Sequence, residues 1–247
     1  MTELSLECNN LSKKFRWYER HDSLKRKFAN LWKTSQNVHE WYVLKDINLQ
    51  IRKGERVGII GRNGCGKTTL LKLIAGIYSP TNGNCKIYSQ RMLALIELGV
   101  GFYHELTGKE NIRLNWVFNG LPRTELKHCY DDIVSFAGME KFLDTPLKYY
   151  SSGMVSRLGF AIVSHANPDL LIVDEVLAVG DAEFQKQCYE KIDQLCKNGI
   201  TLIFVSHSKQ DVEQVCDRAI WLEDGFVRHD GNTNETIDIY TKSITGQ

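Results

Sequence analysis

The sequence lacks the features that mark a secreted, membrane-spanning or nucleic-acid-binding chain. Its longest purely apolar run, Met92-Leu93-Ala94-Leu95-Ile96, is far shorter than the ~20 apolar residues that a helix needs to cross a bilayer. Residues 1–5 have neither a basic start nor an apolar core, so we expect no secretory signal. Lys and Arg number 31 against 30 Asp and Glu, and a net charge of +1 gives no global argument for nucleic acid as a partner. We expect a cytoplasmic chain that reaches a membrane only through another subunit.

Proline is scarce as well, and the cysteines do not follow the spacing of a metal site. The 4 prolines come with no low-complexity linker and no internal repeat. The 7 cysteines are odd in number and no two have the spacing of a zinc knuckle, so we expect free thiols in a reducing compartment. A length of 247 residues with 43% hydrophobic residues suits a globular chain with a sizeable core.

Hydrophobic patterning predicts an α/β fold. The runs 170–173 and 201–205 are apolar apart from Thr201, which indicates strands buried on both faces of a parallel sheet. Strand and helix alternate from there, whereas residues from about 108 to 166 are mostly helical, which indicates a helical insertion. The expected strands are Leu4–Cys8, Tyr42–Ile51, Arg56–Ile60, one near Cys85–Tyr88, Leu170–Val173, Ile200–Ser206, Ala219–Leu222 and Phe226–Arg228. The other expected helices are Lys67–Ala75, Glu183–Lys197, Gln210–Cys216 and Thr233–Thr241.

A glycine-rich segment between an expected strand and an expected helix is typical of a phosphate-binding loop. It fits the pattern G-x-x-x-x-G-K-[ST] and lies in the context that the pattern requires. Glycines let successive backbone N–H groups converge on an anion, and the following helix adds its positive N-terminus. Lys67 is expected to reach the β- and γ-phosphates, and Thr68 to ligate Mg²⁺. The expected nucleotide contacts are Gly61, Arg62, Asn63, Gly64, Cys65, Gly66, Lys67, Thr68 and Thr69.

Two carboxylates and a histidine follow later apolar strands. Asp174 ends a buried strand, where a carboxylate is costly unless it meets a cation or hydrogen-bond donors, so we expect it to hold Mg²⁺ through its water shell. Glu175 comes next and can polarise the attacking water, although two surface acids at a strand end remain an alternative. His207 follows a third strand, at the edge where parallel sheets bind ligands, and is expected to contact the γ-phosphate.

With these elements in this order, the sequence resembles the ATP-binding-cassette (ABC) ATPases. The deciding segment is Tyr149-Tyr150-Ser151-Ser152-Gly153-Met154, which lies where that family carries its L-S-G-G-Q signature. Ser151 and Gly153 match the signature, whereas Ser152 replaces the first Gly and Met154 replaces the Gln.

One branch of the family is especially similar. The segments Asp174–Asp181, Arg157–Ala161 and Glu97–Phe102 resemble the ATPase subunits of bacterial exporters of lipid-linked polysaccharide, namely O-antigen, capsule and teichoic acid.

The resemblance implies a fold and a mode of action. The fold is a P-loop NTPase with a RecA-like core of mainly parallel strands, an antiparallel β subdomain and a helical subdomain over about 100–166. ATP and Mg²⁺ are the implied cofactors, and two ATP molecules join a head-to-tail homodimer. Ser151, Ser152 and Gly153 then face the γ-phosphate held by the other subunit. Two copies of a separate membrane subunit, a lipid-linked polysaccharide substrate and no nucleic acid complete the implied assembly.

Two family positions are not matched directly. The loop into the helical subdomain normally carries a glutamine, and Glu97 is the candidate for that position. Phe15 fits the position of the aromatic that stacks on adenine, but Trp41 and Tyr42 lie close to the next strand and are alternatives.

The cassette pattern runs to Asp224-Gly225, which leaves 22 residues (247 − 225). We therefore expect a single domain over 1–247, with no C-terminal carbohydrate-binding domain. The leading functional hypothesis is that the chain is the ATP-hydrolysing subunit of an exporter, which moves a polysaccharide across the bacterial inner membrane. O-antigen is the favoured polysaccharide. The alternative is a soluble or regulatory ABC ATPase that is not coupled to glycan transport.

A basic stretch within residues 16–41 is more than a minimal cassette needs. Leu24, Phe28, Leu31 and Trp32 fall on one face of an expected helix, and basic residues lie off that stripe. This pattern is typical of a helix at a membrane interface, and the alternative is a helix packed on the cassette with a solvated basic face. In the first case we expect the helix to contact the lipid-pyrophosphate end of the substrate. The basic residues at its centre are Lys25, Arg26 and Lys27.

Overall fold

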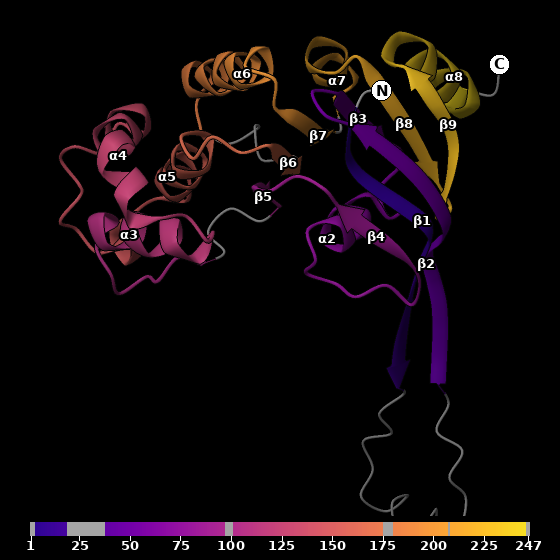
Figure 1. Ribbon diagram of the computed structural model, residues 1–247, viewed down its shortest axis with the longest axis horizontal. Helices are drawn as coiled ribbons and strands as arrows, with labels where there is room; N and C mark the ends of the chain where they lie inside the picture. The colour runs from indigo at the N-terminus through magenta and orange to yellow at the C-terminus, as the bar shows by residue number, and fades with distance from the viewer. Residues whose placement is uncertain (1–2, 19–37, 97–100, 175–179, 207, 246–247) are drawn as a thin grey trace, which may run out of the picture.

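The described elements form two sheets and a set of helices (Figure 1). The structure is a computed structural model that describes residues 3–18, 38–96, 101–174, 180–206 and 208–245.

The larger sheet has six described strands in the order β5-β6-β7-β3-β8-β9. All neighbouring pairs are parallel except β8 and β9, which form a hairpin. This confirms the expected α/β fold with a mainly parallel sheet. The bounds are β3 (Arg56–Ile60), β5 (Met92–Leu95), β6 (Leu170–Asp174), β7 (Thr201–Val205), β8 (Arg218–Glu223) and β9 (Phe226–Asn232).

One group of helices lies at one end of the molecule, and the others lie on the two sides of the large sheet (Figure 1). Helices α3 (Gly108–Phe118), α4 (Arg123–Ala137) and α5 (Ser152–Ser164) form the expected helical insertion, with a short 3-10 helix at Leu147–Tyr149. The other helices are α2 (Lys67–Ile74), α6 (Ala182–Lys197), α7 (Lys209–Val215) and α8 (Thr233–Thr245). Helix α2 lies on the side of the large sheet opposite to α6, α7 and α8.

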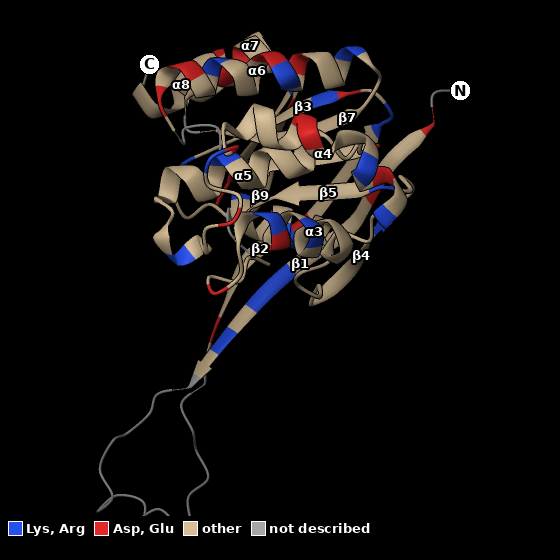
Figure 2. Ribbon diagram, turned by 90° about the vertical axis from the view of Figure 1, so that its left-hand side faces the viewer, with Lys and Arg blue, Asp and Glu red and all other residues tan. Residues whose placement is uncertain are grey.

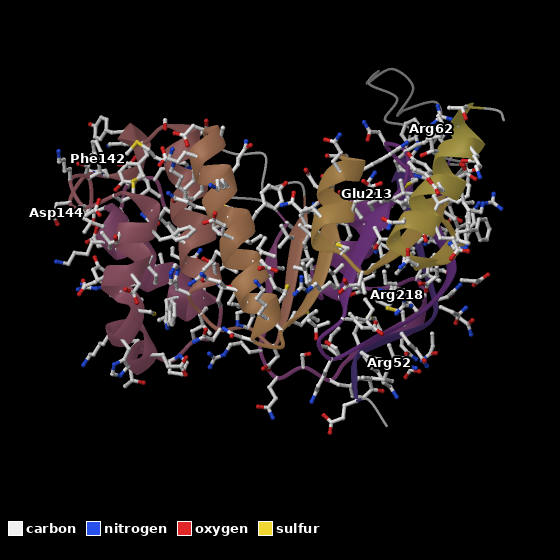
Figure 3. The ribbon with its side chains drawn as sticks, turned by 90° about the horizontal axis from the view of Figure 1, so that it is seen from above. Arg52, Arg62, Phe142, Asp144, Glu213 and Arg218 are labelled. Carbon is white, nitrogen blue, oxygen red and sulfur yellow. The ribbon has the colours of Figure 1, made fainter. Side chains whose placement is uncertain are left out.

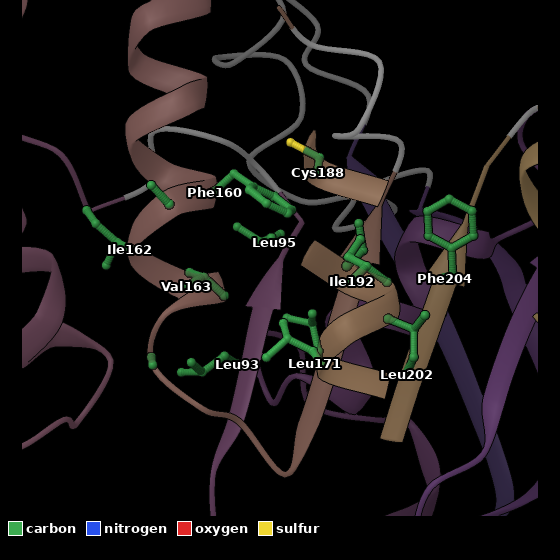
Figure 4. Close-up of a cluster of buried hydrophobic side chains, with 14 of the residues drawn as sticks. Leu93, Leu95, Phe160, Ile162, Val163, Leu171, Cys188, Ile192, Leu202 and Phe204 are labelled. Atoms are coloured by element: carbon green, nitrogen blue, oxygen red, sulfur yellow. The ribbon is translucent and has the colours of Figure 1, made fainter. Parts of the chain in front are cut away.

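The central strands β6 and β7 of the large sheet are buried on both faces, as the apolar runs predict. In β6, Leu171 and Val173 join the hydrophobic cluster that includes α5 and α6, part of which Figure 4 shows. Leu170 and Ile172 join the second cluster, which includes α2 and the small sheet. Each of these four side chains is 0% exposed. A buried leucine contributes about 1.5–3 kcal/mol, so the two clusters fix the sheet on which the site residues lie.

The smaller sheet is antiparallel, in the order β2-β1-β4. Its strands are β1 (Leu4–Tyr18), β2 (Val38–Arg52) and β4 (Asn82–Ile87). In Figures 1 and 2 the paired ends of β1 and β2 extend away from the rest of the described elements.

Three expectations differ from the observed strands. Strand β5 was not expected, although it pairs with β6 along its whole length. Strand β1 continues past Cys8 to Tyr18, because its second half pairs with the first half of β2. Residues 16–18 and 38–41 of the expected insertion are therefore strand, and the expected helix at 24–32 lies outside the described residues.

Among the described helices, none combines the length and the apolar character that crossing a membrane requires.

Candidate nucleotide-binding site

The phosphate loop joins β3 to α2 in a conformation that glycine makes possible. Gly66 caps α2 with φ 110°, in the left-handed region that residues with a Cβ seldom adopt. A Cβ at this position would lie 2.8 Å from Leu44 Cδ2 and 3.1 Å from the Val43 carbonyl oxygen. At Gly61 a Cβ would lie 2.2 Å from the Leu222 carbonyl oxygen. The loop is therefore closely packed against β2 and β8, and its shape is set by its neighbours.

The Lys67 side chain lies inside this loop. It is buried, and Nζ donates to the carbonyl oxygens of Gly61 at 2.8 Å and Arg62 at 3.2 Å. The ammonium thus lies where a phosphate bound in the loop would neutralise it. No side chain in the described part of the chain caps the N-terminus of α2, so its first N–H groups are available to an anion.

The magnesium candidates lie at the same edge of the sheet. Thr68 is exposed in the first turn of α2, and Asp174 is the last residue of β6. Strand β7 alone separates β6 from β3, which places the ends of β6 and β3 about 10 Å apart. Asp174 is 6% exposed, and a buried carboxylate is costly unless it meets a cation or hydrogen-bond donors. A hydroxyl and a carboxylate are ligands that Mg²⁺ accepts, so these residues fit the expected metal.

Three expected residues are not placed by the structure. Glu97, Glu175 and His207 lie outside the described residues, and their roles stay predictions.

The residues on both sides of position 207 are held by a polar network. Ser206 donates its hydroxyl to Asp211 Oδ2 at 3.0 Å, and the Ser208 amide donates to Ser206 Oγ at 3.1 Å. Ser208 also caps α7 by accepting from the Asp211 amide at 3.2 Å. Burial, and next a hydrogen bond with Asp211, raise the pKa of Tyr189 on α6. This network was not expected, because only the short Ser-x-x-Asp spacing of the cap is visible in the sequence.

Ser151 is the N-cap of α5, as the resemblance to the signature requires. Its Oγ accepts from the Met154 amide at 3.1 Å, and both Ser151 and Ser152 are exposed. The preceding Tyr150 donates its hydroxyl to the Phe142 carbonyl oxygen at 2.7 Å. Figure 3 shows Phe142 at one end of the molecule and Arg62 of the phosphate loop at the other. The signature helix is thus remote from the phosphate loop of its own chain.

An ion pair links α5 to the N-terminus of α6. Arg157 of α5 bonds to Asp181 Oδ2 at 2.6 Å, and its guanidinium lies 4.8 Å from the centre of the Phe184 ring. Asp181 caps α6 by accepting from the Phe184 amide at 2.9 Å. The hydrogen bond from the Phe184 amide first, and then the positive charge of Arg157, hold the pKa of Asp181 below its ordinary value.

Phe15 belongs to an aromatic cluster. Its ring centre lies 6.0 Å from that of Trp41 and 5.6 Å from that of Tyr78. Lys13 Nζ lies 5.2 Å from the centre of the Phe15 ring. The alternatives Phe15 and Trp41 are therefore neighbours, and Tyr78 is a member that the sequence did not reveal. Tyr42, the third alternative, is 43% exposed and lies under Lys14 Nζ.

Comparisons with known proteins agree on the family. The family model described as ABC transporter matches residues 44–178. The O-antigen export system ATP-binding protein RfbB of Klebsiella pneumoniae is 43% identical over 83% of this chain and 83% of its own length. The teichoic acids export ATP-binding protein TagH of Lactiplantibacillus plantarum is 40% identical over 97% of this chain and 65% of its own length.

Solved structures agree on the fold. The ATP-binding subunit of an ABC transporter superposes with a TM-score of 0.76 at 23% identity, over 96% of this chain and 93% of the other. An ATP-binding cassette in a dimeric post-hydrolysis state with ADP and Pi gives 0.73 at 21% identity, over 92% of this chain and 98% of the other. The expected ABC ATPase fold is confirmed. With a phosphate loop of the required geometry and relatives of this similarity, the chain belongs to the ABC transporter family, as an ATP-binding ATPase.

Proposed function

We propose that this chain is the ATP-hydrolysing subunit of an exporter that moves a lipid-linked polysaccharide, with O-antigen as the favoured substrate, across the bacterial inner membrane. The observation that carries the proposal is the phosphate loop closed around Lys67, in a chain 43% identical to an O-antigen export ATP-binding protein. The relatives' names favour export over a regulatory role.

In this proposal the described residues bind the triphosphate and position it. Loop N–H groups and the N-terminus of α2 contact the β- and γ-phosphates, and Lys67 exchanges its bonds to loop carbonyls for phosphate oxygens. Thr68 and Asp174 would hold Mg²⁺, which neutralises charge on the phosphates when bound. Glu175 accepts a proton from the attacking water, and His207 contacts the γ-phosphate.

The second half of each site comes from a second copy of the chain. Ser151 and the N-terminus of α5 are exposed and remote from their own phosphate loop, so an ATP bound to one copy meets the α5 N-terminus of the other. Two ATP molecules then hold a head-to-tail homodimer, and hydrolysis releases it. The ion pair of Arg157 with Asp181 joins α5 to the N-terminus of α6.

The dimer works at the cytoplasmic face of the membrane, bound to two copies of a separate membrane subunit. Figure 2 marks Lys and Arg positions in blue along the paired ends of β1 and β2. Two aromatic side chains lie at the same ends of these strands, with Trp17 48% and Trp41 51% exposed. Trp17 stacks on His39, and Lys14 and Arg16 both pair with Glu40. Exposed tryptophans beside basic residues suit a membrane interface. They support the proposal that the basic insertion between β1 and β2 contacts the lipid-pyrophosphate end of the substrate.

Deletion of the gene in its native host tests the proposal. Wild-type chain should restore polysaccharide at the cell surface, whereas Lys67→Ala should leave lipid-linked polysaccharide on the cytoplasmic side. Normal surface polysaccharide in the deletion strain would assign the chain to another role.

A further inference from the structure

Two cysteines lie opposite each other on neighbouring strands of the smaller sheet. Cys8 of β1 and Cys85 of β4 are direct partners in the antiparallel register. Cys8 donates to Cys85, and the two Sγ atoms lie 3.0 Å apart although 77 residues separate them in sequence. Opposed residues of antiparallel strands have Cα atoms about 4.5–5.5 Å apart, within the roughly 4.4–6.8 Å that a disulfide spans.

We propose that Cys8 and Cys85 form a thiol-modification site, which a low-molecular-weight disulfide converts to a disulfide between the two strands. The Sγ atoms need to approach by only about 1 Å to reach the bonded distance of roughly 2.0 Å. The strand pairing already holds both Cβ atoms on one face of the sheet, so closure needs side-chain rotation and no change of register.

The two thiols differ in exposure and acidity, which sets the order of the reaction. Cys85 is half-buried, whereas Cys8 is 1% exposed. The hydrogen bond from Cys8 lowers the pKa of the Cys85 thiol. The same contact first, and burial second, raise the pKa of Cys8. A small reagent therefore reaches Cys85 first, and meets it as the better nucleophile.

The reaction is two successive thiol–disulfide exchanges. The Cys85 thiolate attacks one sulfur of the small disulfide, whose S–S bond breaks, and the released thiolate takes up a proton. Cys8 then gives its proton to solvent and attacks Cys85 Sγ, which releases the second small thiol. One small disulfide is reduced to two thiols while Cys8 and Cys85 are oxidised to one disulfide.

Cys129 offers a matched control. It is half-buried like Cys85, but its Sγ contacts the backbone carbonyls of Glu125 and Leu126 at 3.6 and 3.8 Å. Among the described residues, which include all 7 cysteines, no second thiol makes such a contact with Cys129, so a mixed disulfide formed there would not be resolved.

The experiment equilibrates the full chain with mixtures of reduced and oxidised glutathione, quenches with acid and maps the cysteine peptides by mass spectrometry. We expect a Cys8–Cys85 crosslink, the loss of two of the 7 thiols, and a Tm raised by several degrees, because the crosslink constrains the unfolded chain. Reductant should reverse all three changes, and Cys129→Ser should leave them unchanged.

Removing the resolving thiol tests the order of the steps. In Cys8→Ser, glutathione should stay attached to Cys85. The proposal is overturned if wild-type chain keeps a stable glutathione adduct on Cys85. It is also overturned if Cys85 stays reduced in mixtures that modify Cys129. Both outcomes are read in the wild-type chain and do not depend on how the variant folds.

Discussion

Replacing Gly66 by alanine should strain the phosphate loop or displace the helix that follows it. The new Cβ would lie 2.8 Å from Leu44 Cδ2, and Leu44 is fully buried, so it cannot move aside into solvent. The Val43 carbonyl oxygen, at 3.1 Å, blocks the same space from the backbone of β2. Gly66 also holds φ at 110°, which alanine disfavours. Either the fold accepts the strain or the start of α2 shifts away from β2.

The magnitude follows from these two penalties. A left-handed backbone conformation costs an alanine about 1–2 kcal/mol. Overpacking against a buried side chain adds about 1–3 kcal/mol. At about 2–4 °C for each kcal/mol in a chain of this size, Tm should fall by roughly 4–20 °C. If the start of α2 shifts instead, the fall in Tm is smaller and the N–H groups no longer converge on the phosphates. ATP affinity should drop in this second case, whereas the larger fall in Tm marks the first.

Gly76 supplies the matched control. It follows α2 with φ 72°, and a Cβ there would meet nothing within 4 Å. Gly76→Ala therefore carries the backbone penalty alone, which corresponds to a fall in Tm of roughly 2–8 °C. Thermal unfolding and titration with a fluorescent ATP analogue measure both variants. Unchanged ATP affinity in Gly66→Ala, with a stability equal to that of Gly76→Ala, would refute the reasoning.

Three further predictions concern catalysis, the insertion and pH. Glu175→Gln should keep ATP binding and lose most turnover in a phosphate-release assay, and near-normal hydrolysis by this variant would exclude Glu175 as the general base. Lys67→Ala should instead lose nucleotide affinity in a binding titration. Glutamate at the three basic positions 25–27 should block export and leave the ATPase activity of the isolated chain intact, and unchanged export would contradict a lipid contact there. The pKa of Asp181 in the folded chain lies below its ordinary value of 3.8. The contacts of the carboxylate with Phe184 and Arg157 therefore stabilise the fold fully above pH 3.8, and this stabilisation is lost as the pH falls through the lowered pKa. The Tm difference between wild type and Asp181→Asn should shrink below about pH 4, and a constant difference would argue against the charged form.

Local signals in the sequence predicted the strand and the helix that flank the glycine-rich loop. The loop at 61–68 and the strand and helix around it depend on residues that are adjacent in the chain, so pattern and structure coincide. The apolar runs at β6 and β7 predicted burial on both faces for the same reason.

Features that depend on distant pairing were not predicted. Strand β5 has four residues and is defined by its pairing with β6, which lies far along the chain. The second half of β1 is rich in charge and carries no strand pattern of its own, and β2 makes it a strand. Cys85 meets Cys8 because the small sheet brings β4 beside β1. Tyr78 lies in the segment between α2 and β4, and its contact with Phe15 joins residues far apart in the sequence.

Transport in a reconstituted system tests the central claim most directly. The chain and its membrane subunit are placed in vesicles that contain lipid-linked polysaccharide, and glycan reaching the opposite leaflet is measured with and without ATP. We predict movement of the glycan that requires ATP and stops when Glu175→Gln replaces the wild-type chain. Glycan movement that is the same without ATP, or that continues at full rate with Glu175→Gln, would contradict the account.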